Sequence, residues 1–153
     1  IFFMYNEVFH LQLIEKYSPS GPCSCPTCVS YCKRPGWWTI DQACNALYRG
    51  YAARMMLEIS PDRTFGVLSP AFKGNEGGVS LQIFSDNGCT FLQNNLCELY
   101  STGLQPLECR FCHHSRRGKG IACHNDIGQE WNSANGQQLV NFWYRKYLLR
   151  KFF

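Results

Sequence analysis

The chain of 153 residues has no run of eighteen apolar residues, which is about the length that a transmembrane helix needs. It also offers no secretory signal at its start, because Asn6 and Glu7 follow the first apolar residues and no basic residue precedes them. The GxxxxGK phosphate loop and a glycine-rich dinucleotide motif are missing as well. We therefore expect a soluble, cytoplasmic protein with no membrane partner, and no common nucleotide-dependent enzyme.

Charged residues make up only 17% of the sequence, whereas apolar residues make up 45% and aromatic residues 15%. This composition excludes a disordered charged tail and supplies enough apolar surface for one core. The length is typical of a single domain. We predict one cysteine-cluster metal-binding domain over residues 1–153, in which residues 1–22 form an N-terminal helix and linker and residues 133–153 a C-terminal capping helix.

The basic residues gather in the last third of the chain. Residues 1–108 carry seven basic and nine acidic residues, and residues 109–153 carry eight basic and two acidic ones. Arg116, Arg117 and Lys119 form a group that could contact nucleic acid. The favoured interpretation is that the basic residues balance the negative charge of metal-bound thiolates, so nucleic acid is the weaker partner hypothesis.

Ten cysteines are far more than an ordinary domain of this size contains. Seven of them fall into two tight groups, which include the pairs Cys25-x2-Cys28 and Cys109-x2-Cys112. Cysteines three residues apart can both reach one ion from a tight turn, whereas a disulfide between them would close a strained ring. The spacing thus favours a metal site in a reducing cytoplasm, with a secreted disulfide scaffold as the structural alternative.

The pattern of apolar residues predicts three helices, over residues 4–17, 39–48 and 133–149. Thr39 is a favourable N-cap for the second of these helices, and Gly50 should end it. The segment from Cys23 to Pro35 has no periodicity, so we expect a cysteine-rich loop there. The glycines at positions 118 and 120 predict another loop, leading to Cys123 and His124.

Strands are expected at residues 55–59, 65–68 and 79–84, and these three should form a small antiparallel sheet. A hairpin should join residues 89–92 to residues 96–100, because Asn94 and Asn95 tolerate the positive φ angles of a tight turn. The predicted fold class is therefore α+β, a small antiparallel sheet with flanking helices, held together by metal-bound cysteine clusters.

Cysteine thiolates are soft ligands for zinc, iron or an iron–sulfur cluster. Cys44 lies on the apolar face of the second helix and is expected to be a core residue. Neighbouring side chains in an extended chain point in opposite directions, so His113 and His114 should supply one ligand at most. Eight or more ligands allow two sites. The candidate metal ligands are Cys23, Cys25, Cys28, Cys32, Cys89, Cys97, Cys109, Cys112, Cys123, His113 and His124.

Two stretches of the sequence resemble a known family. The segments CTFL from Cys89, LCELY around Cys97 and QPLECR around Cys109 are similar to the signature of the cysteine-cluster proteins described as zinc- or iron-chelating domains. Those proteins also carry an upstream CxxxCxxCC motif, where this chain has CxCxxCxxxC from Cys23, followed by the similar segment PGWWT. The resemblance implies metal chelation, and some longer relatives are regarded as lysine methylases that act on flagellin.

We therefore predict a metal-binding protein that chelates zinc or iron through clustered cysteines and whose metal ion is its partner. An iron–sulfur redox or methylase-like enzyme and a zinc-stabilised nucleic-acid-binding module are the alternatives. Glu98 and Glu108 adjoin cysteines, but no spacing identifies a reaction, so no activity follows from the sequence. Because much of the cysteine-bearing chain has no regular structure of its own, the metal-free protein should be partly disordered.

Overall fold

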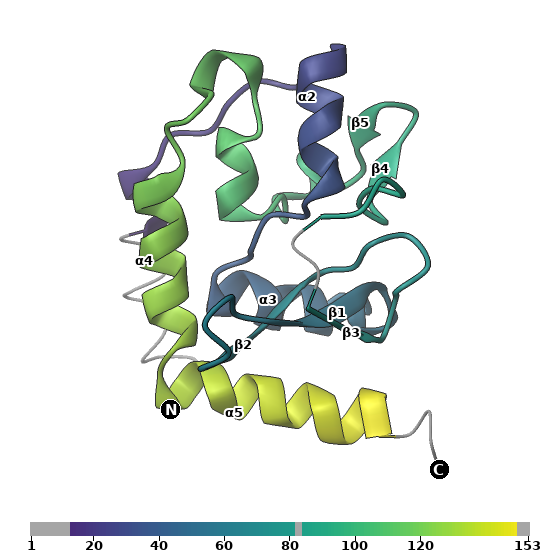
Figure 1. Ribbon diagram of the computed structural model, residues 1–153, viewed down its shortest axis with the longest axis vertical. Coiled ribbons are helices and arrows are strands. Elements are labelled where there is room, and N and C mark those ends of the chain that lie inside the picture. Colours follow the sequence, from purple (N-terminus) through teal and green to yellow (C-terminus); the bar gives the residue numbers. More distant parts are fainter. Residues whose placement is uncertain (1–12, 82–83, 150–153) are drawn as a thin grey trace.

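The computed structural model describes residues 13–81 and 84–149, and the chain folds as a mixture of helices and two small sheets (Figure 1). The three-stranded sheet and helix α3 lie in one half of the molecule, and helix α5 runs along the outer side of that half. Helix α2, the β4–β5 hairpin and the turns after residue 100 lie at the opposite end. The cysteine-bearing segments therefore meet away from α5.

Helix α3 spans Ile40–Tyr48 and begins as the sequence predicts. The Thr39 side chain accepts a hydrogen bond from the backbone N–H of Gln42, and the Gln42 side chain accepts one from the backbone N–H of Thr39. This reciprocal pair is a capping box, which satisfies two N–H groups that the first turn leaves unpaired. Gly50 follows the helix with a φ of 91°, a conformation that favours glycine.

The larger sheet has the strand order β2–β1–β3, with β1 at Met55–Ile59, β2 at Gly66–Pro70 and β3 at Val79–Ser80. Strands β1 and β2 pair antiparallel, as predicted. Strand β3, however, runs parallel to β1, so the expectation of a wholly antiparallel sheet is wrong. The reason is that the end of β2 lies beside the start of β1. The short connection after Pro70 crosses β1 near that start, so β3 then runs in the same direction as β1 on its other side.

The predicted hairpin is present. Strands β4 (Leu92–Gln93) and β5 (Leu96–Cys97) pair antiparallel around Asn94 and Asn95, whose φ angles are 51° and 64°. Two successive residues with positive φ are the mark of the tight turn that suits the twist of a hairpin. The short-range signal in the sequence was therefore sufficient to place β5, which carries Cys97.

Two helices complete the fold. Helix α5 (Ala134–Trp143) is capped by the Ser133 side chain, which accepts a hydrogen bond from the N–H of Gly136, and it continues into one wider helical turn at Tyr144–Leu148. This agrees with the predicted C-terminal helix. Helix α4 (Ile121–Trp131) was not predicted, because its buried face includes a cysteine and a glutamate, which conceal the helical period in the sequence.

The first cysteine-rich segment, residues 23–35, is also more regular than expected. Helix α2 covers Pro26–Ser30 and is followed by a 3-10 turn at Tyr31–Lys33, so the expectation of a plain loop over residues 23–35 is wrong. Of the helix predicted at residues 4–17, only residues 13–16 are described and helical, and residues 1–12 lie outside the described part. No helix in the described ranges is long and apolar enough to cross a membrane.

Four tryptophans form the centre of the core, and each indole N–H has an acceptor. Trp37 donates to Glu58 at 2.8 Å, and Trp131 donates to the carbonyl of Trp38 at 2.7 Å. Trp38 and Trp143 donate to backbone carbonyls in the same way. Buried aromatic side chains contribute strongly to the free energy of folding when their polar atoms are paired, so these four indoles stabilise the core.

Candidate metal centre

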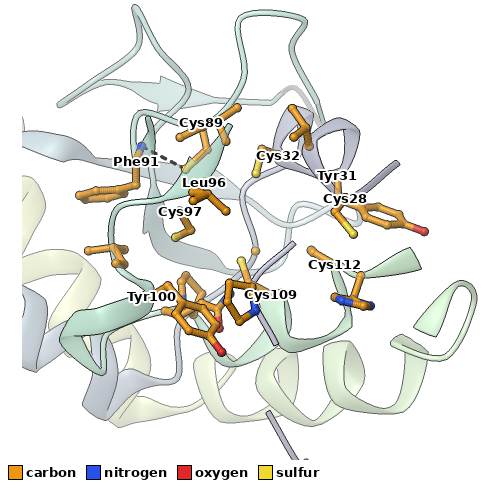
Figure 2. A pocket seen from close by; sticks show the side chains of 18 of the residues that line it. Cys28, Tyr31, Cys32, Cys89, Phe91, Leu96, Cys97, Tyr100, Cys109 and Cys112 are labelled. Atoms are coloured by element: carbon orange, nitrogen blue, oxygen red, sulfur yellow. Dashed lines mark hydrogen bonds between the residues drawn. The ribbon is translucent and has the colours of Figure 1, made fainter. Parts of the chain in front are cut away.

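The fold brings eight of the nine predicted cysteine ligands to one end of the molecule. They come from four segments: the chain around α2, Cys89 with its backbone bridge to Phe72, strand β5, and the 3-10 turn at Leu107–Phe111 with the residue that follows it. Figure 2 shows several of the sulfurs from these different segments directed toward a common space. The eight cysteines separate into two neighbouring groups, which we call the surface centre and the buried centre.

The surface centre consists of Cys23, Cys25, Cys28 and His114. The three sulfurs lie 3.7, 3.6 and 3.3 Å from Nδ1 of His114, in that order. A tetrahedral zinc ion, with sulfur ligands at about 2.3 Å and nitrogen ligands at about 2.0 Å, separates sulfur from nitrogen by about 3.5 Å. The three observed distances are close to this separation, so one ion could contact the three sulfurs and Nδ1 of His114.

Local hydrogen bonds place the sulfurs of the surface centre. Cys25 is the N-cap of α2, and its sulfur accepts a hydrogen bond from the N–H of Cys28. The sulfur of Cys28 accepts one from the N–H of His114 at 3.2 Å. The bond from Cys28 lowers the pKa of Cys25 to about 6, while burial raises the pKa of Cys28 to about 11. Backbone N–H groups directed at sulfur favour the thiolate, the form that binds metal.

His113 also lies at the surface centre, and its ligand atoms are within 4.8 Å of those of Cys23, Cys28 and His114. The His113 ring stacks on that of His114 with the centroids 4.3 Å apart, so the two rings do not point in opposite directions as expected. The reason is that a 3-10 turn starts at His114 and the chain is not extended there. Nδ1 of His113 is hydrogen-bonded to Ser115, which favours His114 as the ligand.

The buried centre surrounds a cavity of about 360 Å³. Figure 2 shows its sulfurs on different sides of this cavity, which also has apolar side chains such as Leu96 in its wall. Five cysteines exceed the four ligands that one tetrahedral ion requires. We assign five of the cysteines that line the cavity to the buried centre: Cys32, Cys89, Cys97, Cys109 and Cys112; Cys23, Cys28 and His113 of the surface centre line the same cavity.

Burial and neighbouring thiols raise the pKa of Cys32, Cys89, Cys97 and Cys109, which favours their neutral form. Burial, together with the charges of neighbouring cysteines, raises the pKa of Cys32 and of Cys89 to about 12. The pKa of Cys109 is raised by its hydrogen bond with Cys112 and by burial. One contact acts in the opposite direction: the sulfur of Cys89 accepts a hydrogen bond from the N–H of Phe91 at 3.4 Å, which lowers the pKa of Cys89. A metal cation would reverse the balance and hold the thiolates.

Gly36 allows the chain to pass close to the buried centre. A Cβ atom at this position would lie 2.5 Å from the sulfur of Cys109 and 3.0 Å from its backbone nitrogen. Both distances are below ordinary van der Waals contact, so only glycine fits without a shift of the backbone. The segment that leads from Cys32 to the buried Trp37 and Trp38 is thus held directly against the cysteine.

Two predicted ligands lie elsewhere. Cys123 is fully buried in the core on α4, and neither it nor His124 lines the cavity. Nδ1 of His124 contacts the carboxylate of Glu108, and its ring stacks on Trp37 with the centroids 4.3 Å apart. The structure therefore does not bring Cys123 or His124 to either centre. Cys44 is buried in the core, as expected.

A buried charge network that the sequence did not reveal surrounds Trp37. Arg34 donates to Glu108 at 3.0 Å, and Glu108 also accepts from the backbone N–H of Trp37. Burial raises the pKa of Glu58 to about 7. The one signal in the sequence was the charged Glu58 inside the otherwise apolar strand Met55–Ile59, a pattern that indicates a buried partner.

The three basic residues predicted to contact nucleic acid differ in their contacts within the protein. Arg116 donates to the carbonyl of Pro19 and to the hydroxyl of Ser18, and thus fixes the chain that leads to the surface centre. Its guanidinium is therefore occupied within the protein. The side chains of Arg117 and Lys119 are exposed and have no hydrogen-bond or ion-pair partner in the described part of the chain, although the backbone N–H of Lys119 donates to the carbonyl of Arg116. The three residues do not form one free cationic surface.

No family model, no curated protein and no solved structure matches the chain. The resemblance to the zinc- or iron-chelating cysteine-cluster proteins therefore stays a prediction. What can be said of the two centres depends on the positions of their own side chains.

Proposed function

We propose that the protein binds metal at two neighbouring thiolate centres, with zinc or iron as the metal. The observation that carries the proposal is the surface centre, where three sulfurs lie 3.3 to 3.7 Å from one histidine nitrogen. Sulfur and neutral imidazole are the ligands that zinc and iron accept from proteins. Four ligands close a tetrahedral site, which is the arrangement of structural rather than catalytic zinc.

An iron–sulfur cluster is a second candidate for the buried centre alone. A single tetrahedral ion draws four sulfurs to within about 3.8 Å of one another, which leaves no room between them. The cavity of about 360 Å³ between these cysteines is larger than one ion requires. A cluster of iron and sulfide would occupy the space between the thiolates and would supply electron-transfer chemistry. All ten cysteines are free, which agrees with the reducing cytoplasm that we propose as the compartment.

The test is elemental analysis and visible absorption of protein purified without oxygen. We expect about one equivalent of zinc for the surface centre, and either a second zinc or iron with acid-labile sulfide for the buried centre. Zinc alone gives a colourless solution, whereas iron with sulfide gives a broad visible band. Protein that is purified in this way and contains neither zinc nor iron would contradict the proposal.

Serine variants assign the metal to the centres. The double variant Cys25→Ser, Cys28→Ser should lose the surface equivalent, and Cys97→Ser, Cys109→Ser should lose the metal of the buried centre. Cys44→Ser is the matched control, because Cys44 is a buried cysteine outside both centres. Metal contents that stay unchanged in both double variants would overturn the assignment.

A further inference from the structure

The two centres differ in how they are built into the fold. The ligands of the surface centre come from two short segments, residues 23–28 and the turn that starts at His114. His114 is exposed, Cys23 and Cys25 are half-buried, and Cys28 is buried but lies outside the apolar core cluster. Small local movements of such segments have low free-energy cost. The metal of the surface centre can therefore become accessible without disturbance of the core.

The ligands of the buried centre are held by more of the fold. Cys89 is 9% exposed and its backbone bridges to Phe72, Cys97 lies in the β4–β5 hairpin, and Cys109 packs against Gly36. Because these segments are packed against the core from different directions, several must move together before the metal can leave. The movement that releases the metal of the buried centre should therefore occur less often than the one that releases the metal of the surface centre.

Exposed positive charge follows the surface centre along the chain, and at the buried centre the charge of Lys73 acts on Cys32. Arg117 and Lys119 follow His114 within five residues, and their side chains are exposed and carry no partner among the described residues. Unpaired cations at a surface raise the local concentration of anions and the rate at which they arrive. An anionic metal ligand is thus attracted to the centre whose metal is the more accessible.

We propose that the surface centre exchanges its metal ion with small anionic chelators that carry carboxylate or thiolate donors, whereas the buried centre keeps its metal. The proposal depends on the proposed function, since both centres must bind metal. In each step of the exchange a donor atom of the chelator forms a bond to the ion as a protein ligand leaves. The released thiolates take protons from water, His114 is released as neutral imidazole, and no electron is transferred.

The experiment measures metal release from the fully loaded protein at low ionic strength. The anionic chelator is ethylenediaminetetraacetate, and the neutral one is tetrakis(2-pyridylmethyl)ethylenediamine. We expect one equivalent to leave at least about tenfold faster than the metal of the buried centre, and His114→Ala to abolish or accelerate this fast phase. A single phase for all the metal, or a fast phase that His114→Ala leaves unchanged, would overturn the proposal.

Charge reversal tests the role of the cations. Arg117→Glu, Lys119→Glu should slow the fast phase with the anionic chelator by about tenfold and leave the rate with the neutral chelator unchanged. Arg145→Glu, Lys146→Glu is the matched control, because it makes the same change of charge on exposed residues near the end of α5, far from the centre (Figure 1). Equal effects of the two variants would contradict the proposal. A protein that binds no metal would instead remove the proposed function itself.

Discussion

Gly36 lies so close to Cys109 that no larger side chain fits beside the sulfur without a movement of the chain. The Gly36→Ala variant would place a methyl group 2.5 Å from the sulfur of Cys109, so either the sulfur or the backbone must move. We expect this variant to lose the metal of the buried centre and to lower the free energy of unfolding by about 1–3 kcal/mol. Metal analysis and thermal unfolding measure the two effects.

Gly21→Ala is the control for this prediction, because nothing lies within 4 Å of a Cβ at that position. It should keep both the metal content and the melting temperature. If Gly36→Ala retained its metal as well, the close contact with Cys109 would have no functional importance.

Glu130 makes stability depend on pH. Burial raises its pKa from 4.5 to about 7, although the backbone N–H of Ile40 donates to one carboxylate oxygen. The folded state therefore holds this proton more tightly than the unfolded state, and stability falls as the pH rises through the interval from about 4.5 to 7. Glu130→Gln, which keeps an oxygen acceptor without the charge, should lose this dependence.

We expect the advantage of Glu130→Gln over the natural protein to grow by about 2 kcal/mol between pH 5 and pH 8. Denaturant unfolding of both proteins at each pH measures it, and effects of pH on the metal cancel in the comparison. Equal pH dependence of the two proteins would show that Glu130 keeps an ordinary pKa in the fold.

At the level of elements, local signals in the sequence were reliable. The N-cap Thr39 and the pair Asn94-Asn95 act over a few residues, so the start of α3 and the β4–β5 hairpin could be predicted. The direction of β3 could not, because it depends on where β2 ends in space. Helix α4 was missed because Cys123 and Glu130 occupy its buried face, where apolar residues are the usual signal.

The same distinction applies to the candidate ligands. The hairpin around Asn94 and Asn95 followed from neighbouring residues, although Cys97 pairs across it with Leu92 and Cys89 bridges to Phe72 instead. The contact of His114 with the sulfurs of Cys25 and Cys28 joins segments 86 to 89 residues apart, which no spacing rule can supply. His124 was predicted as a ligand from its place beside a cysteine, whereas α4 turns it toward Glu108.

The backbone conformation of the turn at Asn94 and Asn95 positions strand β5 and Cys97, and substitutions at Asn95 test this. Asn95 has a φ of 64°, a conformation that costs alanine more than asparagine because alanine lacks a short polar side chain that can hydrogen-bond locally. Asn95→Ala should lower the free energy of unfolding by about 1 kcal/mol, whereas Asn95→Gly should keep or raise it. Denaturant unfolding measures both, and a destabilised glycine variant would contradict this explanation.

For the whole molecule, one apolar core contains the four tryptophans and extends to Phe91, Leu99 and Leu107, beside the end that carries the two centres. The four tryptophans, α3, α5 and strands β1 and β2 pack together, and each indole N–H has an acceptor. The end that carries the two centres has short helices and two-residue strands, whose hydrogen bonds alone give little stability. Metal binding should therefore stabilise one end much more than the other.

Removal of the metal should accordingly unfold the protein in part. With an excess of chelator under reducing conditions, we expect amide hydrogen exchange to rise by at least about tenfold in residues 23–33 and 89–112 and to change little in β1, β2 and α5. The thermal transition should also move to lower temperature, because a ligand that binds only the folded state stabilises it by mass action. Mass spectrometry of peptides from the loaded and the stripped protein measures this directly. Equal protection of all segments after removal would mean that the cysteine-bearing end folds without metal, and a uniform rise along the chain would mean that the tryptophan core needs the metal as well.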